Sequence, residues 1–127
     1  MSVPSTLEVG KQLVVLCNQG ENLKAVDTLY SPNIICIESM AMPGMPARME
    51  GIQAVRGKNQ WWLDNHTVHS GKAYGPWPLG DRFIVHFDYD VTPKAGPMAN
   101  QRMKMEEAAL YTVKDGKIVQ EEFFYSM

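Results

Sequence analysis

The chain has 127 residues, a length that suits one domain, so we expect a single domain over residues 1–127. It carries 12 lysines and arginines against 14 aspartates and glutamates, a formal net charge of -2, and has no basic run. This balance argues against nucleic acid as a partner, because affinity for phosphate backbones needs clustered positive charge. Hydrophobic residues make up 45% and charged residues 20%, which argues against a disordered chain.

The sequence carries no signature of a membrane span, a leader or a cofactor. No apolar stretch approaches the roughly 20 residues that cross a bilayer, and the segment MSVPSTLEVGK lacks the regions of a signal peptide. We therefore expect no membrane contact and a cytoplasmic location. The glycine-rich nucleotide motifs and the CxxC pairs of zinc sites are missing, so we expect no cofactor and no metal. Cys17 and Cys36 lie among aliphatic residues, which predicts two reduced, buried thiols.

Two helices are predicted at the start of the chain. Ser5 and Glu8 have the spacing of a capping box, and the apolar residues that follow predict a helix from about Thr6 to Asn18. Gly20 ends this pattern. Apolar residues then recur at three and four positions over residues 23–30, which predicts a short second helix antiparallel to the first.

A strand, a loop and a third helix are predicted next. Residues 34–37 are apolar and mostly β-branched, which predicts a short strand that begins after Pro32 and ends at Glu38. The following residues, 39–50, are rich in methionine, proline and glycine, and we expect an apolar loop at the rim of a cavity. From Gly51 to about His66, apolar residues fall on one stripe, and Lys58 falls off it.

The rest of the chain, from Val68, alternates with a period of two. Odd-numbered residues from Phe83 to Val91 form the apolar side of one strand, and a long strand is predicted over about residues 102–113. The sequence Asp115-Gly116 then predicts a hairpin turn into a last strand that ends at Tyr125. Helices first and an antiparallel sheet second predict an α+β fold.

Four segments carry a resemblance to a known family: LYSPNIICIES, GIQAVRG, RFIVHFDYDV and ALYTVKDGKIVQEEFFY. Over about Thr6 to Tyr125 the chain resembles the SnoaL-like, ketosteroid-isomerase-like branch of the nuclear transport factor two superfamily. The resemblance implies a cystatin-like cone, in which a curved, mostly antiparallel sheet wraps three N-terminal helices. It also implies an apolar pocket at the open end and a homodimer through the convex face of the sheet.

The resemblance implies that Glu38 is a catalytic carboxylate. In isomerase-like members the matching position, eight residues after the aromatic that Tyr30 resembles, moves the proton. Burial at a cavity would raise the pKa of such a group toward the range of a general base. The alternative is a strand-end glutamate that points to water. Strand parity puts Cys36 and Glu38 on the inner side and Ile35 and Ile37 on the outer side.

Glu107 and His66 complete the predicted catalytic set. The family's second acidic position matches Ala109 here, and Glu107, on the same face of its strand, could replace that acid as a neutral donor to an oxyanion. Equally, Glu107 could be half of an ion pair with a lysine or arginine. His66 ends the stripe of the third helix and could transfer protons near neutral pH, or it could be a helix-terminal histidine. His66 and His69 have the spacing HxxH, but no third metal ligand accompanies them.

An apolar pocket is predicted from the same patterns. Its predicted lining, which could also be plain core, consists of Asn59, Trp62, Phe87, Tyr89, Tyr111, Phe123 and Tyr125. The first-helix tyrosine of steroid isomerases has no counterpart near Leu13, which argues against steroid isomerisation itself.

Three functions remain open from the sequence. The first is an isomerase, cyclase or dehydratase that acts on an apolar carbonyl compound by carboxylate acid/base chemistry. The second is a module that binds a small hydrophobic molecule without chemistry, and the third is a dimerisation domain. Convergence of Glu38, Glu107 and His66 on one cavity would favour the enzyme. The expected dimer face holds Ile84, His86, Asp88, Asp90, Leu110 and Phe124.

Overall fold

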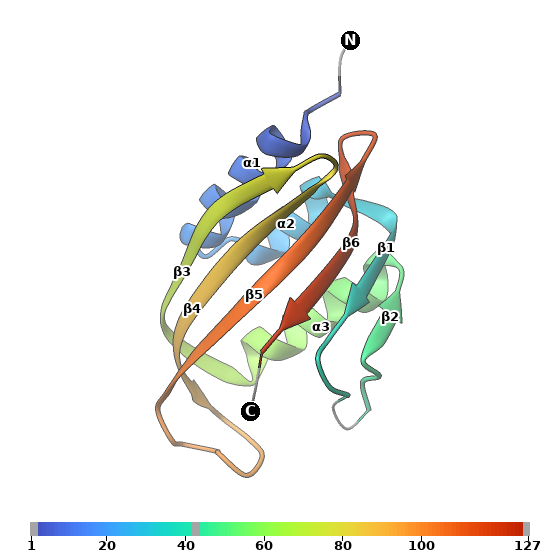
Figure 1. Cartoon of the computed structure of the whole chain (residues 1–127). Coiled ribbons are helices and arrows are strands. Elements are labelled where there is room, and N and C mark those ends of the chain that lie inside the picture. Colours follow the sequence, from blue (N-terminus) through green and yellow to red (C-terminus); the bar gives the residue numbers. More distant parts are fainter. Residues whose placement is uncertain (1–2, 42–43, 126–127) are drawn as a thin grey trace.

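The computed structural model of the chain describes residues 3–41 and 44–125. Within these ranges, three helices pack on one side of a curved six-stranded sheet whose strand order is β2-β1-β6-β5-β4-β3 (Figure 1). The elements are α1 (Thr6–Asn18), α2 (Asn22–Leu29), β1 (Tyr30–Ile37), β2 (Arg48–Glu50), α3 (Ile52–Asp64), β3 (His66–Leu79), β4 (Arg82–Pro93), β5 (Met103–Lys114) and β6 (Lys117–Phe124). The predicted α+β class and the cone of sheet around three helices are confirmed.

Helix α1 begins with the capping box that the sequence predicted. The Ser5 hydroxyl accepts a hydrogen bond from the Glu8 N–H at 3.1 Å, and the Ser5 N–H donates to the Glu8 carboxylate at 3.2 Å. These bonds satisfy amide groups that have no partner within the helix. The helix buries Val9, Gly10 and Leu13 against β3 and β4, which fixes one wall of the interior.

Strand β1 differs from the prediction, because it begins at Tyr30 and runs through Pro32. It pairs with β6 in parallel, with an irregularity between Tyr30 and Ile35, and Pro32 lies exposed within that irregularity. A proline is tolerated there because it does not have to donate to the ladder. The parallel pair makes the sheet mixed. All three helices precede strands β3 to β6, as expected, and β1 lies between α2 and α3, where a strand was predicted.

The segment 39–50 is not loop throughout, as was expected. Its last residues form β2, which pairs antiparallel with β1 and sets Met49 opposite Cys36. Pairing with an edge strand needs only backbone hydrogen bonds, such as the one from Glu38 N–H to Ala47 C=O at 2.8 Å, so the unfavourable composition did not prevent it. Met42 and Pro43 lie outside the described residues.

Helix α3 also ends earlier than predicted, at Asp64, and His66 is the first residue of β3. The Asn65 carbonyl accepts a hydrogen bond from the Lys94 N–H at 2.8 Å, and His66 pairs with Pro93 of β4. His66 therefore belongs to the sheet and not to α3, because it pairs with β4.

Strands β3 to β6 form the predicted antiparallel meander. Phe83, Val85 and Phe87 are buried on the inner face of β4, as the alternation predicted. Asp115 and Gly116 join β5 to β6 with φ values of 52° and 76°, the left-handed geometry that this turn sequence favours. In the described part of the chain, no helix is long and apolar enough to cross a membrane.

Two helical glycines provide a matched test of the packing of α1. A Cβ added at Gly10 would lie 2.8 Å from the ring of Pro76, whereas a Cβ added at Gly57 meets nothing within 4 Å. We expect Gly10→Ala to lower the free energy of unfolding by about 1 kcal/mol or more, because a rigid ring must move. Gly57→Ala should raise it by about 0.5–1 kcal/mol through helix propensity. Chemical unfolding of both variants checks this pair, and stabilisation by Gly10→Ala would contradict the packing described.

Candidate active site

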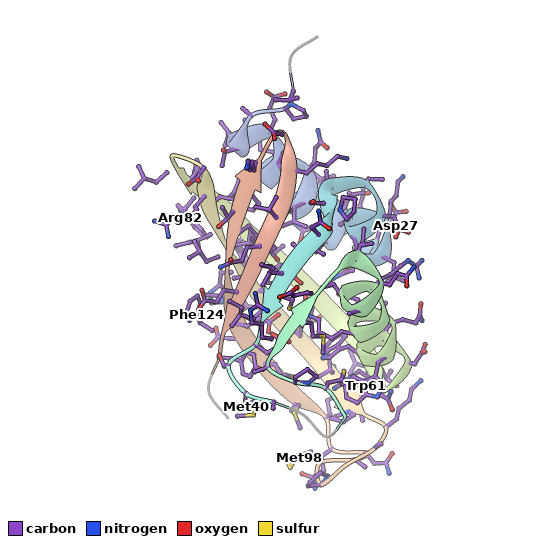
Figure 2. The ribbon with its side chains drawn as sticks, turned by 90° about the vertical axis from the view of Figure 1, so that its right-hand side faces the viewer. Asp27, Met40, Trp61, Arg82, Met98 and Phe124 are labelled. Atoms are coloured by element: carbon purple, nitrogen blue, oxygen red, sulfur yellow. The ribbon has the colours of Figure 1, made fainter. Side chains whose placement is uncertain are left out.

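A cavity of about 450 Å³ lies between the inner face of the sheet and the helices. Its wall includes Glu38, Glu107 and His66, the three predicted catalytic residues. It also includes every residue predicted to line the pocket, namely Asn59, Trp62, Phe87, Tyr89, Tyr111, Phe123 and Tyr125. Met40, Trp61 and Met98 belong to the same wall and lie toward one end of the molecule, where their side chains are partly exposed (Figure 2). The geometry brings together the residues that the sequence singled out.

Lys58 lies at the centre of the charged part of the cavity, which the sequence analysis did not predict. Its ammonium Nζ lies 3.6 Å from Glu38 Oε1 and 3.5 Å from Glu121 Oε1, and its side chain is only 12% exposed. The spacing contained a signal, because position 58 is three residues after the buried Val55 and four before Trp62. The usual exposure of lysine outweighed that signal.

Glu121 is the second functional residue that the sequence analysis missed. It is 1% exposed, and its Oε2 accepts a hydrogen bond from the Tyr30 hydroxyl. Its strand parity matches that of Phe123, which was predicted to face the cavity, so the alternation of β6 contained the signal. Tyr30 donates a hydrogen bond to Oε2, and the Lys58 ammonium lies 3.5 Å from Oε1, which has no hydrogen-bond partner among the described residues.

Glu38 faces the cavity, as its strand parity predicted. Cys36 is fully buried on the same side of β1, whereas Ile35 and Ile37 are half-buried on the other side. Oε1 of Glu38 faces Lys58, and Oε2 is buried without a hydrogen-bond partner among the described residues. Burial raises the pKa of Glu38 above its usual value, the Lys58 ammonium opposes this rise, and the Glu121 carboxylate adds to it.

Glu107 reaches the same cavity from β5, where it pairs with Phe87 in the sheet. Among the described residues it forms no ion pair, so the alternative of a pair with lysine or arginine was wrong. Burial raises the pKa of Glu107 to about 7, and the charge on Glu38 adds to this effect. Near neutral pH, Glu107 is therefore present in a protonated form that can donate a hydrogen bond.

His66 lines an aromatic part of the cavity. Its ring stacks on Trp62 with a centroid separation of 4.4 Å, and Trp62 in turn contacts Tyr89 at 5.2 Å. The His66 Nδ1 lies 2.7 Å from the Trp62 carbonyl oxygen. A carbonyl only accepts, so Nδ1 carries the proton and Nε2 remains available as an acceptor.

The HxxH pair does not form the start of a metal site, because the His69 ring bonds Thr92 Oγ1 at 2.8 Å. Among the described residues, the group whose donor atoms approach one another within 4.8 Å is His86, Asp88 and Glu106. This group is partly exposed on the outer face of the sheet, away from the cavity.

The two cysteines are free thiols, as predicted, although Cys17 is half-buried rather than buried. Burial raises the pKa of Cys17 to about 12, and the Glu121 charge adds to the effect. The pKa of Cys36 is raised as well, first by burial, even though Lys58 Nζ donates to its Sγ at 3.0 Å. Neither thiol is therefore a reactive nucleophile at neutral pH.

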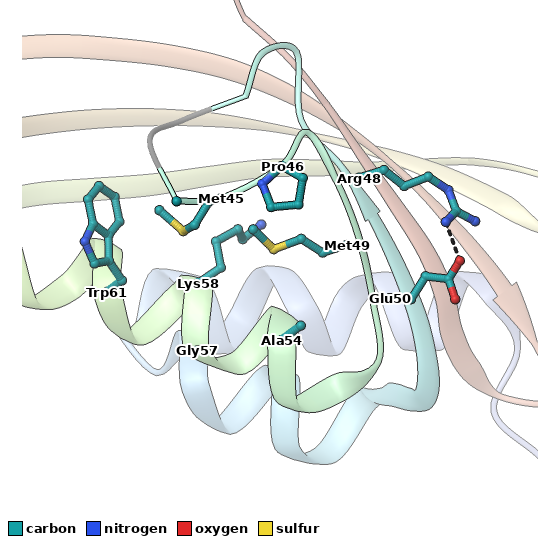
Figure 3. Close-up of a pocket in the computed structure, with 10 residues that line it drawn as sticks. Met45, Pro46, Arg48, Met49, Glu50, Ala54, Gly57, Lys58 and Trp61 are labelled. Atoms are coloured by element: carbon teal, nitrogen blue, oxygen red, sulfur yellow. Dashed lines mark hydrogen bonds and ion pairs between the residues drawn. The ribbon is translucent and has the colours of Figure 1, made fainter.

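A second, shallower hollow of about 620 Å³ lies outside the cavity, between the segment 44–50 and α3. Met45, Met49 and Lys58 line both spaces, so their side chains separate the outer hollow from the cavity (Figure 3). Arg48 and Glu50 form an ion pair at the far end of this hollow.

Comparison with known proteins gives concordant matches. The profile of the SnoaL-like domain family matches residues 4–125. A crystal structure from Mesorhizobium loti, described as a SnoaL-like polyketide cyclase, is 41% identical and has a TM-score of 0.88, with 96% of this chain and 100% of that chain covered. Curated proteins give no match.

More distant structures share the fold. A protein with a cystatin-like fold from Xanthomonas campestris is 15% identical with a TM-score of 0.76, covering 98% of this chain and 92% of that one. A protein from Catenulispora acidiphila with a ketosteroid-isomerase-like fold, in complex with trimethylamine, is 16% identical with a TM-score of 0.68. That match covers 99% of this chain and 88% of the other.

The raised pKa of Glu107 predicts a pH-dependent loss of stability. The folded state keeps this proton up to about pH 7, whereas an ordinary glutamate releases it near 4.5. Rising pH therefore removes stability across that window, by about 1–3 kcal/mol in all. Glu107→Gln removes the titrating group. The free energy of unfolding of the variant, measured with urea, should therefore rise relative to that of the parent between pH 4.5 and 8. Glu122→Gln, on the outer face of β6 and without an ion pair among the described residues, is the control, and an equal pH trend in all three proteins would contradict the prediction.

Proposed function

Because the chain belongs to the SnoaL-like family, we propose that it is an enzyme that applies carboxylate acid/base chemistry to an apolar carbonyl compound. Isomerisation, cyclisation and dehydration are the candidate reactions. The observation that carries the proposal is the pair of carboxylates, Glu38 and Glu107, which line one apolar cavity in different electrostatic environments. Such a difference divides two like groups into a base and an acid.

Glu38 acts as the base in this proposal. Its Oε1 faces the Lys58 ammonium, which favours the ionised form, and its buried Oε2 has no partner among the described residues. That oxygen takes a proton from the carbon next to the substrate carbonyl. The electron pair of the broken C–H bond forms a C=C bond, and the carbonyl π electrons move to oxygen.

Glu107 supports the charge that develops on the oxygen. At neutral pH its protonated form donates a hydrogen bond, and it can transfer its proton to the enolate oxygen. His66 is the alternative group for this step, as a proton donor from Nε2 when its ring is charged. Collapse of the enol then returns the O–H proton to Glu107 while the protonated Glu38 delivers its proton to carbon, at the original or at another position.

The aromatic lining supports an apolar substrate. A volume of about 450 Å³ falls within the range of small-molecule sites, roughly 300–1,000 Å³. The His66 ring stacks on Trp62, and Tyr89 contacts Trp62 at an interplanar angle of 52°, so this part of the wall is aromatic and suits an apolar cyclic molecule. The same wall favours the second candidate, a module that binds a small hydrophobic molecule without chemistry, and loss of activity on mutation separates the two.

Glu38→Gln tests the base directly. The variant preserves shape but cannot accept the proton, so we expect the rate to fall by about 10²- to 10⁴-fold. The probe is exchange of the α-protons of 2-tetralone, a small apolar ketone, for deuterium in D₂O, followed by NMR. Since tetralone is a surrogate, a wider panel of cyclic ketones follows if it does not react.

Glu122→Gln, one residue along the strand from Glu121 and on the opposite face, is the control and should exchange at the parental rate. Exchange by Glu38→Gln at the parental rate would remove Glu38 as the base. Tight binding of the ketones without exchange in the parent protein would favour the binding module.

We also propose that the protein forms a homodimer through the outer face of the sheet. Ile84 and Phe124 are 44% and 49% exposed there, and Ile84 pairs with Leu110 and Trp77 across neighbouring strands. These side chains form an apolar group among polar neighbours, a composition that suits a two-fold interface.

Ile84→Lys should convert the dimer into a monomer, because the same charge would enter the interface twice across the two-fold axis. Sedimentation velocity at micromolar concentration measures the change. Leu79→Lys, at the exposed end of β3, is the control and should remain dimeric. A parent protein that sediments only as a monomer would disprove the dimer.

A further inference from the structure

The ammonium of Lys58, on α3, is surrounded by side chains from β1, from Glu38 just after β1, and from β6. Its Nζ donates to Cys36 Sγ on β1 at 3.0 Å and lies 4.6 Å from the centre of the Phe123 ring on β6. The carboxylates of Glu38 and Glu121 lie 3.6 and 3.5 Å from the same Nζ. These partners on β1, just after it and on β6 together fix the position of the ammonium group.

From this geometry we propose that Lys58 is a positioning residue, which Glu121 and Tyr30 hold in place so that it keeps Glu38 ionised with Oε2 free for the substrate. The inference rests on the proposed function and deepens it, because it names the group that prepares the base. Lys58 itself touches no reacting atom in this scheme.

The state of the Lys58 amine follows from its neighbours. Burial alone would lower its pKa, but the charges of Glu121 and Glu38 and the bond to the Cys36 sulfur raise the pKa above the usual lysine value. The group therefore remains an ammonium ion. This excludes a nucleophilic amine and leaves an electrostatic role.

Tyr30 and Glu121 form the rear support of Lys58. The Tyr30 hydroxyl donates to Glu121 Oε2, which leaves Oε1 of the same carboxylate to face Lys58. This division mirrors that of Glu38, whose Oε1 faces Lys58 and whose Oε2 has no partner among the described residues. Glu121 Oε1 has the Lys58 ammonium at 3.5 Å but no hydrogen-bond partner among the described residues, whereas Glu38 Oε2 has neither a hydrogen bond nor a cation beside it.

The charges around Glu38 predict that Lys58 and Glu121 have opposite effects on its ionisation. Lys58 on α3 favours the ionised form of Glu38, whereas Glu121 on β6 disfavours it. Glu107 on β5 and Tyr125 after β6 also interact with the Glu38 charge, and Cys36 lies on its own strand. Loss of Lys58 should therefore make Glu38 harder to ionise, and loss of Glu121 should make it easier.

The test follows the Glu38 carboxyl carbon by ¹³C NMR during pH titration of the full chain, without any substrate. We expect Lys58→Met to move its titration midpoint up by about one pH unit or more, and Glu121→Gln to move it down. Lys58→Arg restores the charge and should bring the midpoint back toward that of the parent. Lys24→Met, which removes an exposed lysine of α2, is the control and should leave the midpoint in place.

The rate of 2-tetralone exchange gives the second readout. Lys58→Met should shift the acid limb of kcat to higher pH, so that the rate falls further below that of the parent as the pH decreases, with little change in KM. A merely structural role would lower the rate equally at all pH values. If the parent exchanges none of the ketones, the proposed function fails, but the NMR titration still tests the role of Lys58.

Lys58→Met leaves Glu121 buried without its cation and could unfold the chain. The double variant Lys58→Met/Glu121→Gln removes both charges and should restore stability. In it the Glu38 midpoint should still lie above that of the parent, because Lys58 affects Glu38 more than Glu121 does. An unchanged midpoint in the double variant, or shifts of the same sign in the two single variants, would overturn the proposal.

Discussion

The interaction on which the cavity depends is the burial of the Lys58 ammonium between two carboxylates. A charge removed from water costs several kcal/mol unless partners surround it. Here the partners come from the end of β1 and from β6, while Lys58 itself comes from α3. Formation of the site therefore requires that all three elements meet.

The same ammonium explains why two glutamates in one cavity behave differently. Glu38 lies within reach of Lys58, whereas Glu107 forms no ion pair in the described part of the chain. Burial raises the pKa of both groups and Lys58 opposes the rise at both, but only Glu38 lies within ion-pair distance of the ammonium, and the Glu38 charge further raises the pKa of Glu107. The position of Lys58 thus gives two chemically equal groups different electrostatic environments.

Sequence patterns correctly predicted the elements that interactions between neighbouring residues stabilise. The capping box at Ser5 fixed the start of α1, and alternation fixed which residues of β4 face inward. The Asp115-Gly116 turn likewise depends only on neighbours in sequence. Strand β2 and the parallel pairing of β1 with β6 could not be read in this way, because they join backbone segments whose side-chain patterns say nothing about partners.

The residues of the site likewise fall into those that the sequence identified and those that only the fold revealed. The sequence by itself identified Glu38, Glu107 and the aromatic wall, since parity and resemblance assign each side chain to a face. Only the tertiary structure decided that Lys58 and Glu121 belong with them, although both have spacings that would allow it. Tyr30 and Glu121 are 91 residues apart, and Lys58 lies between them in the chain. Charged residues are usually exposed, so the spacing of a lysine or glutamate in the sequence does not show that it is buried. Burial requires partners of opposite charge, and only the fold brings those partners together.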